Sequence, residues 1–444
     1  MIPSSLEKQL TAALESREAR QIRRSLPPSA DTALVDFSSN DYLSLSKSSD
    51  LRTRFLEKLG STKQILGSGG SRLLVNGSAH VDLEDRLRIF FSRTDTAPQS
   101  GSSPFSILTL DALLFNSGFD ANVGFFACVP QPGDLIIHDE YIHASVHDGM
   151  RISRARSIPF KHNSVKDLEK ILLCLKNERP ELVDGNGSVF IAVESLYSMD
   201  GTISPLEDII QLAESAFPSS NAYVSVDEAH CTGIYGPNGR GLVSLLGLQD
   251  RVFARLHTFG KALAGTGAVL LVPPLVKQYL INYARTLIYT TSLSYANVIS
   301  VNCSFDILES GRAEEFSRHV LALCKYLTAA LTDRLRHSLT PIMPEILSLP
   351  EHLQPSASSC SPQLPVPIIP LMTSYPRSLA ARLRTFGLNA RPITWPTVPK
   401  GKERVRICLH AENSFEEVDL LIQYSMQWAT EMAFESSRGV LAKL

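Results

Sequence analysis

The chain has 444 residues, of which 44% are hydrophobic and 20% charged, and its formal net charge is −2 at pH 7. This composition is typical of a globular protein with one large and one or two smaller domains. The charge balance, without a stripe of lysine and arginine, argues against nucleic-acid binding. No apolar run is long enough to span a membrane. Seven cysteines without a CxxC pair favour reduced thiols in an intracellular compartment.

The N-terminal segment predicts a helix at residues 6–26, which a Pro-Pro pair ends. This helix mixes acidic and basic residues and lacks the apolar centre of a signal peptide, so it indicates neither a secretion signal nor a transit peptide. A short strand and a polar turn are expected at residues 35–46. A glycine-rich loop follows and becomes helical at about Ala79. The Pro/Ser-rich segment 94–106 is expected to be a surface loop.

Apolar strands alternate with helical periods from Ile107 to about Gly267. This alternation predicts an α/β fold, with a mostly parallel sheet and helices on both faces. Helices are expected after Tyr289, followed by a Pro/Ser-rich stretch and then a small α+β domain. The predicted division is an N-terminal helix and strand segment at residues 1–48, a large cofactor-binding domain at 49–290, and a small C-terminal domain at 291–444.

The stretch from Tyr223 to Gly267 carries the strongest chemical signal. An apolar, β-branched strand brings Asp227 and His230 to its C-terminal end, where open α/β sheets bind ligands. Lys261 follows in a turn of small residues. Taken singly, the acid and the histidine could be half of a metal site or structural residues, and the lysine a solvated one. Together they supply what pyridoxal 5'-phosphate (PLP) requires, an amine for a Schiff base and an acid for the pyridine nitrogen.

A dinucleotide site is the competing interpretation, because residues 67–70 are the glycine-rich sequence Gly-Ser-Gly-Gly. No predicted strand precedes this sequence, and no acid follows at the distance of about 20 residues that ribose binding requires. The pattern therefore favours PLP over a dinucleotide.

Ordered motifs along nearly the whole chain resemble one family. The sequence TFGKALAGTG at residues 258–267 resembles the lysine signature of class-II PLP-dependent aminotransferases. Together with other motifs it resembles the α-oxoamine synthases, which have the fold of fold-type I PLP enzymes. These other motifs are FSSNDYLSLS, GSGGSR, FNSGFDANVG, YIHASVHDG, ESLYSMDG, VDEAHCTGIYGPNGRG and IYTTS.

The resemblance implies a set of cofactor-binding residues. Lys261 would form the Schiff base and remove the α-proton of the amino acid, and His143 would stack on the ring and serve as a second catalytic residue. Asp227 would pair with the pyridinium nitrogen. The remaining contacts would come from Gly118 and Phe119 through their backbone amides, and from the side chains of Ser198, His230, Thr258 and Thr291.

The resemblance also implies substrate residues and a partner. Arg406 would bind the amino-acid carboxylate, for which a guanidinium fork is well suited. Asn40 and Thr397 would line the same cleft, and Arg24 would meet the acyl-CoA, although Arg23 could be its equivalent and a solvated arginine is as good an interpretation. The pair Thr290 and Thr291 resembles hydroxyls that reach the cofactor phosphate of the neighbouring subunit, which implies a homodimer with shared sites.

Within the family, the chain most resembles the members of the biotin pathway, which join L-alanine to pimeloyl-CoA with loss of CoA and CO2. The first alternative is another α-oxoamine synthase that uses a different acyl-CoA in secondary metabolism. The others are a non-catalytic structural subunit, which predicts loss of the Schiff-base lysine although Lys261 is present, and an ordinary transaminase, which would release no CoA. One departure bears on this choice. Some biotin-pathway members have Ile-Arg-Pro before the Pro-Thr turn, whereas here the arginine is displaced to Arg391 in the sequence Arg-Pro-Ile-Thr-Trp.

The last three residues, Ala442, Lys443 and Leu444, resemble the small-basic-leucine tripeptide that a peroxisomal import receptor binds. The preceding residues are small and polar, so the tripeptide could be presented to such a receptor. A chance match is the alternative, because three residues carry little information. We expect a peroxisomal location ahead of a cytoplasmic one.

Overall fold

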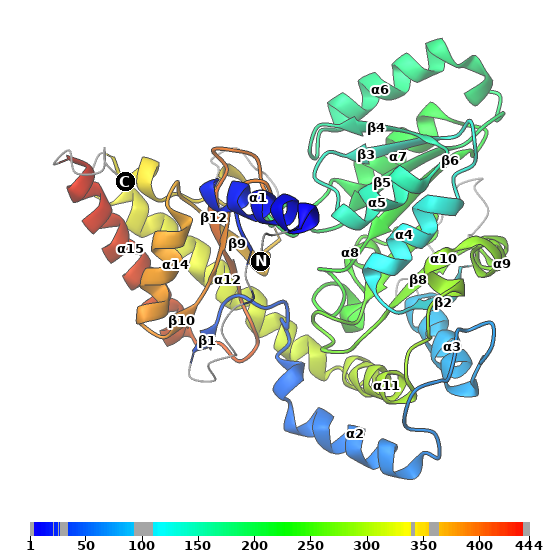
Figure 1. The fold of residues 1–444 in the computed structure, drawn as a ribbon, viewed down its shortest axis with the longest axis horizontal. Helices are drawn as coiled ribbons and strands as arrows, with labels where there is room; N and C mark the ends of the chain where they lie inside the picture. Colours follow the sequence, from blue (N-terminus) through cyan, green and yellow to red (C-terminus); the bar gives the residue numbers. More distant parts are fainter. Residues whose placement is uncertain are drawn as a thin grey trace. The chain divides into compact units, whose positions relative to one another are not determined.

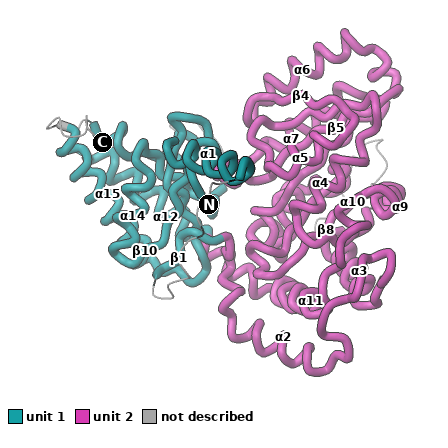
Figure 2. The backbone as a smooth tube through the Cα atoms, viewed as in Figure 1, with its two compact units in different colours: residues 1–39, 321–444 teal, residues 40–320 magenta. Residues whose placement is uncertain are grey.

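The structure is a computed structural model that describes residues 4–20, 22–24, 26, 34–92, 110–338, 342–354 and 364–437. It divides into two compact units, unit 1 with residues 1–39 and 321–444 and unit 2 with residues 40–320 (Figure 2). The boundaries expected after residues 48 and 290 stay predictions. The expected surface loop at 94–106 and the tripeptide Ala442–Leu444 lie outside the described residues, and import through that tripeptide also stays a prediction.

Unit 2 is built on a seven-stranded sheet with the order β2-β8-β7-β6-β5-β3-β4 (Figure 1). The strands are β2 (Asp111–Phe115), β3 (Leu135–Asp139), β4 (Arg156–Phe160), β5 (Val189–Glu194), β6 (Ala222–Asp227), β7 (Ala254–Thr258) and β8 (Ala268–Val272). From β4 to β7 all neighbours pair in parallel, and β8 alone is antiparallel to its neighbours β7 and β2. The predicted α/β fold with a mostly parallel sheet is confirmed.

Helices pack against this sheet and bury its apolar strands. Strands β3, β5 and β8 are buried along their whole lengths, as expected for continuous apolar runs in a sheet covered on both faces. Helix α4 (Gly118–Cys128) contacts β2, β7 and β8, and also packs on α5 (Ala144–Ile152). The other helices of unit 2 are α2 (Ser49–Ser61), α3 (Ser78–Ser92), α6 (Val165–Glu178), α7 (Leu206–Ala216), α8 (Leu242–Leu245), α9 (Pro274–Tyr283), α10 (Arg285–Ile288) and α11 (Tyr295–Glu309).

Unit 1 contains a three-stranded antiparallel sheet with the order β11-β12-β9. Its strands are β9 (Ile368–Met372), β11 (Arg391–Ile393) and β12 (Arg404–Cys408), and a parallel pair is formed by β1 (Val35–Asp36) and β10 (Leu388–Asn389). Its helices are α13 (Met343–Ile346), α14 (Pro376–Thr385) and α15 (Phe415–Ser437), while α12 (Arg312–Arg336) continues from unit 2 into unit 1. Along the described ranges, no helix is both long and apolar enough to cross a membrane.

The N-terminal helix is shorter than predicted. Helix α1 (Ser5–Ala19) begins with a capping box, in which Ser4 and Glu7 bond to each other's backbone amides. The helix stops before the Pro-Pro pair because the Ile22 amide bonds back to the Arg17 carbonyl oxygen at 2.8 Å, and the Ile22 side chain is buried. No residue of α1 itself is buried, although Leu6, Leu10 and Leu14 are spaced along one face.

Candidate active site

The candidate site lies at the carboxyl ends of the parallel strands of unit 2. Asp227 is the last residue of β6, and Lys261 follows β7 by three residues. His143 precedes α5, just beyond the end of β3, and Gly118 begins α4, just beyond β2. Strand ends are the usual ligand-binding edge of such a sheet, because loops there can point side chains and amides into one crevice.

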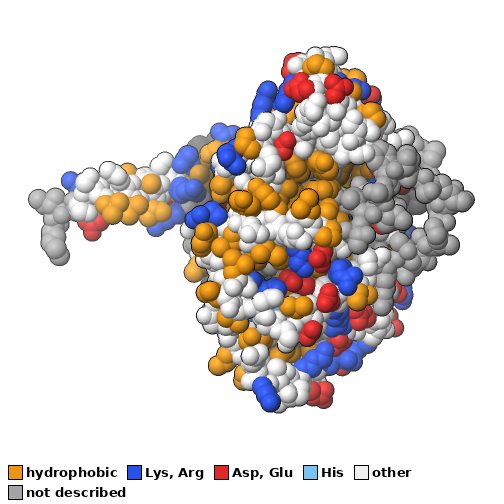
Figure 3. All heavy atoms as spheres, turned by 90° about the vertical axis from the view of Figure 1, so that its right-hand side faces the viewer, with side chains coloured by type: hydrophobic (Ala, Val, Ile, Leu, Met, Phe, Trp, Pro, Cys, Tyr) orange, Lys and Arg blue, Asp and Glu red, His pale blue; other side chains and the backbone are white. Residues whose placement is uncertain are grey.

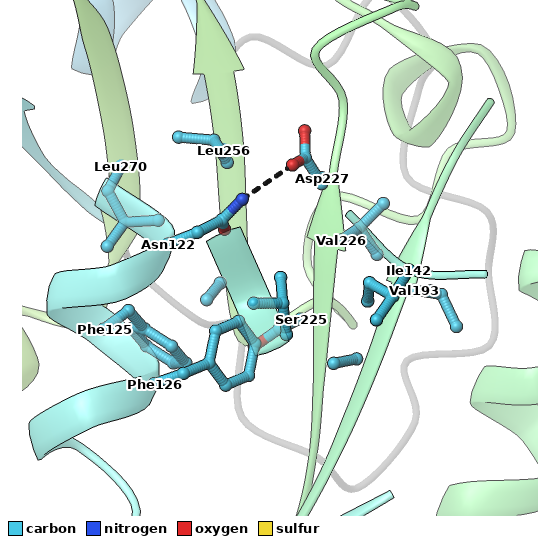
Figure 4. A pocket seen from close by; sticks show the side chains of 13 residues that line it. Asn122, Phe125, Phe126, Ile142, Val193, Ser225, Val226, Asp227, Leu256 and Leu270 are labelled. Atoms are coloured by element: carbon cyan, nitrogen blue, oxygen red, sulfur yellow. Dashed lines mark hydrogen bonds between the residues drawn. The ribbon is translucent and has the colours of Figure 1, made fainter. Parts of the chain in front are cut away.

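Asp227 is a buried carboxylate whose orientation is set by two donors. Its Oδ2 accepts a hydrogen bond from Asn122 Nδ2 at 2.9 Å, and its Oδ1 accepts one from the Ala229 amide at 2.9 Å. Figure 4 shows Asn122 reaching from α4 toward Asp227, with Phe125 and Phe126 below it in this view. Two hydrogen bonds of this kind hold the carboxylate in one position.

Lys261, His230 and Tyr42 form a second hydrogen-bonded group. Lys261 Nζ lies 2.9 Å from His230 Nε2, and His230 Nδ1 lies 2.7 Å from the Tyr42 hydroxyl. A neutral imidazole can join the two because it has one donor and one acceptor nitrogen. Tyr42 is fully buried, and its hydroxyl also donates to Asn40 Oδ1 at 3.3 Å. The predicted substrate residue Asn40 is thereby linked to the predicted cofactor residues.

His143 is connected to Asp227 through two small side chains. His143 Nδ1 accepts a hydrogen bond from the Ser145 amide at 3.2 Å and lies 2.7 Å from Ser145 Oγ. Asn122 Nδ2 donates to Ser145 Oγ at 3.0 Å as well as to Asp227. Because Nδ1 is the acceptor, the proton of the neutral imidazole is on Nε2. Burial lowers the pKa of His143, and the nearby Lys261 charge acts in the same direction while Asp227 opposes it.

The start of α4 is suited to an anion. The first amides of a helix, here those of Gly118 and Phe119, have no partner within the helix, and the helix dipole favours negative charge there. The Thr258 side chain packs over Gly118, where a Cβ atom would lie 3.4 Å from Thr258 Cβ. The hydroxyl of Thr258 therefore lies close to the start of α4.

The remaining predicted cofactor residues lie outside the two hydrogen-bonded groups described above. Thr290 and Thr291 lie after α10 and are bound by Asn116 Nδ2, which donates to Thr290 Oγ1 at 3.1 Å and to the Thr291 carbonyl oxygen at 2.6 Å. Ser198 is half-buried in the loop after β5. The hydrogen bonds recorded for the described residues do not include Ser198 in either of the two groups above.

The predicted substrate residues fall into both units. Asn40 belongs to unit 2, whereas Arg24, Thr397 and Arg406 belong to unit 1. Arg406 is on β12 and is buried, opposite Arg391 of β11 in the sheet register. Thr397 is exposed in a turn in which its amide bonds to the Thr394 carbonyl oxygen at 3.0 Å.

The three arginines that the sequence offers for the acyl substrate, Arg23, Arg24 and Arg391, are all exposed. Arg24 follows α1, and Arg23 forms a surface pair with Glu18 at 3.5 Å. Arg391 lies at the start of β11. An exposed pair of this kind contributes little to stability.

A further buried group supports the loop between β6 and α8. Glu228 is completely buried, and its Oε1 accepts hydrogen bonds from the amides of Leu242 at 2.8 Å and Val243 at 3.1 Å. A Cβ atom at Gly241, where φ is +99°, would collide with this carboxyl group. Burial raises the pKa of Glu228 to about 7, against the opposing effect of the amides and of Arg255.

The residues of the site fit PLP. A buried carboxylate held by Asn122 suits a pyridinium nitrogen, the Lys261 amine beside His230 suits the aldehyde carbon, and the start of α4 with Thr258 suits the phosphate. Sequence reasoning missed Asn122, Ser145, Tyr42 and Glu228. Two of them had a signal in the sequence. Asn122 is a polar residue within an apolar helix pattern, and Tyr42 is the tyrosine of the SSNDY motif.

Comparisons with known proteins agree with this site. The family model for aminotransferase class I and II matches residues 32–424. The 8-amino-7-oxononanoate synthase of Emericella nidulans is 43% identical over 441 residues, which cover 98% of this chain and 99% of the relative. The aminoacyl transferase sphA of Aspergillus fumigatus is 35% identical over 92% of this chain and 84% of its own.

Solved structures share the fold. The Sphingomonas wittichii serine palmitoyltransferase has a TM-score of 0.76 at 24% identity, covering 97% of this chain and 99% of that chain. The 8-amino-7-oxononanoate synthase of Francisella tularensis has a TM-score of 0.67 at 22% identity, covering 91% of this chain and 100% of that chain.

The chain belongs to the aminotransferase class I and II family and, within it, to the α-oxoamine synthases. This membership confirms three predictions from the sequence. The fold is that of a fold-type I PLP enzyme, the cofactor is PLP, and the protein is an acyl-transferring enzyme.

Glu228 generates a prediction about stability and pH. Its pKa is about 7 in the folded state against an ordinary value of 4.5, so the unfolded chain releases this proton at a lower pH than the folded one. Stability from this group is therefore present below pH 4.5, falls as the pH rises to about 7, and is constant above it. Glu228→Gln should remove this fall, which amounts to about 3 kcal/mol at most.

Urea unfolding of wild type and Glu228→Gln at a series of pH values measures the effect. The exposed Glu345→Gln is the control for loss of one acid. A stability difference between wild type and Glu228→Gln that does not change between pH 4.5 and 7 would contradict the assignment.

Ser145 generates a prediction about His143. Ser145→Ala removes a hydroxyl that contacts Nδ1 of the neutral imidazole, so the pKa of His143 should rise. Nitrogen-15 NMR titration of the histidines reports both this pKa and the ring tautomer, with His143→Gln providing the signal assignment. Ser425→Ala is the matched control, because in the described part of the chain the buried Ser425 hydroxyl has no partner. An unchanged pKa and tautomer would show that Ser145 does not hold the imidazole.

Proposed function

We propose that the protein condenses L-alanine with pimeloyl-CoA to give 8-amino-7-oxononanoate, CoA and CO2, a reaction of biotin biosynthesis. The observation that carries this substrate assignment is the 43% identity to a relative of that name, over nearly the full length of both chains. The 34% identical relative in Neisseria meningitidis, a putative 8-amino-7-oxononanoate synthase by name, supports the same reaction.

The surroundings of Lys261 and Asp227 support the tasks that this reaction would give them. Lys261 would hold the cofactor, and its amine, 2.9 Å from His230, would take the proton from the amino-acid Cα atom. Asp227 would keep a proton on the ring nitrogen, because Asn122 and the Ala229 amide hold it as an oriented carboxylate. PLP, when bound, supplies the electron sink for the pair of electrons left at Cα.

The amino-acid Cα then bonds to the acyl carbon as the bond from that carbon to the CoA sulfur breaks. The β-keto acid loses CO2, and a proton returns to Cα. His143 could donate this proton, because its Nε2 carries hydrogen in the neutral tautomer. Lys261 is the other candidate donor. Arg406 would bind the amino-acid carboxylate, and Asn40 and Thr397 are the other predicted substrate residues. Phe119, Thr258 and Ser198 would complete the contacts to the cofactor.

A second candidate is an α-oxoamine synthase that uses a different acyl-CoA. The observation that favours it is the aminoacyl transferase sphA, 35% identical over 92% of this chain. The position before Trp395-Pro396-Thr397 is also occupied by Thr394 where some biotin-pathway members have arginine. The two candidates share the chemistry at Lys261 and differ only in the acyl group.

We also propose a homodimer in which sites are shared. Segments that flank Thr290 and Thr291 leave large apolar side chains exposed, among them Leu66 at 76%, Leu74 at 80% and Tyr289 at 72%. The segment with the two leucines is joined to residues 292–295 by backbone hydrogen bonds. Hydrophobic side chains also gather on the face that Figure 3 shows. Exposed apolar area of this kind is expected at an interface.

The reaction assignment predicts a coloured enzyme with one acyl preference. Purified protein with PLP should absorb in the visible range, and borohydride should fix the cofactor to the wild type and not to Lys261→Ala. With L-alanine, pimeloyl-CoA should be turned over much faster than other acyl-CoAs, measured as thiol release and by mass spectrometry of the product. Preference for another acyl-CoA would establish the second candidate, and protein that stays colourless with added PLP would refute the cofactor assignment.

Shared sites predict complementation between two inactive variants. Lys261→Ala and Thr291→Val should each lose nearly all activity. Mixed and refolded together, they should recover about one quarter of the wild-type activity, because half the dimers are hybrids with one intact site of two. Mixing Lys261→Ala with itself is the control. No recovery in a mixture that forms hybrid dimers would show that Thr291 acts within its own subunit.

A further inference from the structure

A cavity in unit 1 has no assigned role. Its volume is about 480 Å³, within the usual range for a small-molecule site. The residues that matter here are Arg20, Arg377, Lys400, Trp395, Tyr375 and Glu403. They come from the end of α1, the start of α14 and the segment between β11 and β12, so segments distant in sequence form one cavity.

The lining of this cavity is positively charged. Its lining contains three cationic side chains, Arg20, Arg377 and Lys400, and one carboxylate, Glu403, so positive charge is in excess. In the described part of the chain, no carboxylate forms an ion pair with Arg20 or Lys400. A cavity with this excess of positive charge attracts an anion and raises its local concentration.

Two of these cations lie close to the indole ring of Trp395. The Arg20 guanidinium lies 5.8 Å and the Lys400 ammonium 5.3 Å from the centre of the Trp395 ring. Arg20 Nε also donates to the Ser16 carbonyl oxygen at 3.0 Å, which fixes the guanidinium beside the ring. The two charges are therefore positioned before any ligand binds, which reduces the entropy cost of binding.

We propose that this cavity binds an anionic group of the acyl-CoA substrate, in the first place the phosphates of its nucleotide half. The inference rests on the proposed function, because acyl-CoA is the ligand of that reaction with several negative charges. Arginine and lysine are the common partners of phosphate, and arginine can bind it in a bidentate manner. The far carboxylate of a dicarboxylic acyl chain has the same chemistry and is the second source that the experiment must separate.

The position of the cavity in the chain supports this assignment. Trp395 directly precedes the Pro396-Thr397 turn, whose Thr397 is a predicted substrate residue. Thr394, another lining residue, accepts the hydrogen bond of the Thr397 amide. The wall of the cavity is therefore continuous with that turn. Arg23, Arg24 and Arg391, the arginines expected from the sequence to meet the acyl substrate, do not line it.

The test measures binding as well as turnover, with the holoenzyme. The variants are Arg20→Ala, Lys400→Ala and their combination, and the control is Lys402→Ala, an exposed lysine two residues from Lys400 that does not line the cavity. The chain has two tryptophans, so in a Trp428→Phe background the emission of Trp395 reports on the cavity alone. Free CoA, octanoyl-CoA and pimeloyl-CoA are titrated, and the KM values of the two thioesters are measured with L-alanine.

If the nucleotide phosphates bind here, the double variant should lose about tenfold or more in affinity for all three ligands, with kcat little changed. If the far carboxylate binds here, only the values for pimeloyl-CoA should change. Equal values in the double variant and in Lys402→Ala, for all three ligands, would overturn the proposal. Wild type that binds CoA but does not turn over pimeloyl-CoA with alanine would refute the proposed reaction and leave the cavity assignment standing.

Discussion

The hydrogen bond between Asn122 and Asp227 is the interaction on which the rest of the site depends. It joins α4 to the end of β6, and α4 also begins at Gly118 with the amides suited to phosphate. Positions 118 and 122 are about one helical turn apart, so a single rigid element sets the acid and the phosphate site at a fixed separation. The same amide group holds Ser145 and, through it, His143. One buried side chain thus orients two of the predicted cofactor residues.

Buried ionisable side chains next to this site fix the loop that follows Asp227. Arg255 and Glu228 are both buried, and His257, which is stacked on Phe91, has a pKa lowered well below its ordinary value by burial. Removing such groups from water is costly unless they are neutral or hydrogen-bonded. Glu228 meets this condition through the amides of residues 242 and 243. These hydrogen bonds fix the loop directly after Asp227, and this loop carries His230.

The sequence predicted those parts of the site that stand at strand ends. Asp227 and Lys261 follow apolar strands and are unusual there, whereas Asn122 and Ser145 lie within helices whose patterns predict only packing. The direction of β8 was not predictable, because a strand buried on both faces has the same apolar run in either direction. The early end of α1 depends on burial of Ile22, which is a tertiary effect that helix propensity does not include.

Reaction chemistry and substrate choice have different physical bases in this chain. The groups that would support a carbanion belong to unit 2, where a hydrogen bond from the Asn122 side-chain amide orients the buried Asp227. The groups that would recognise anions, Arg406 and the cations around Trp395, belong to unit 1. The exposed cations Arg20 and Lys400 can be exchanged at little cost in stability, whereas a change at Asn122 or Glu228 leaves a buried polar group without a partner. If the proposed cavity binds the acyl-CoA, changes in unit 1 could alter the acyl substrate without disturbing the buried groups around Asp227.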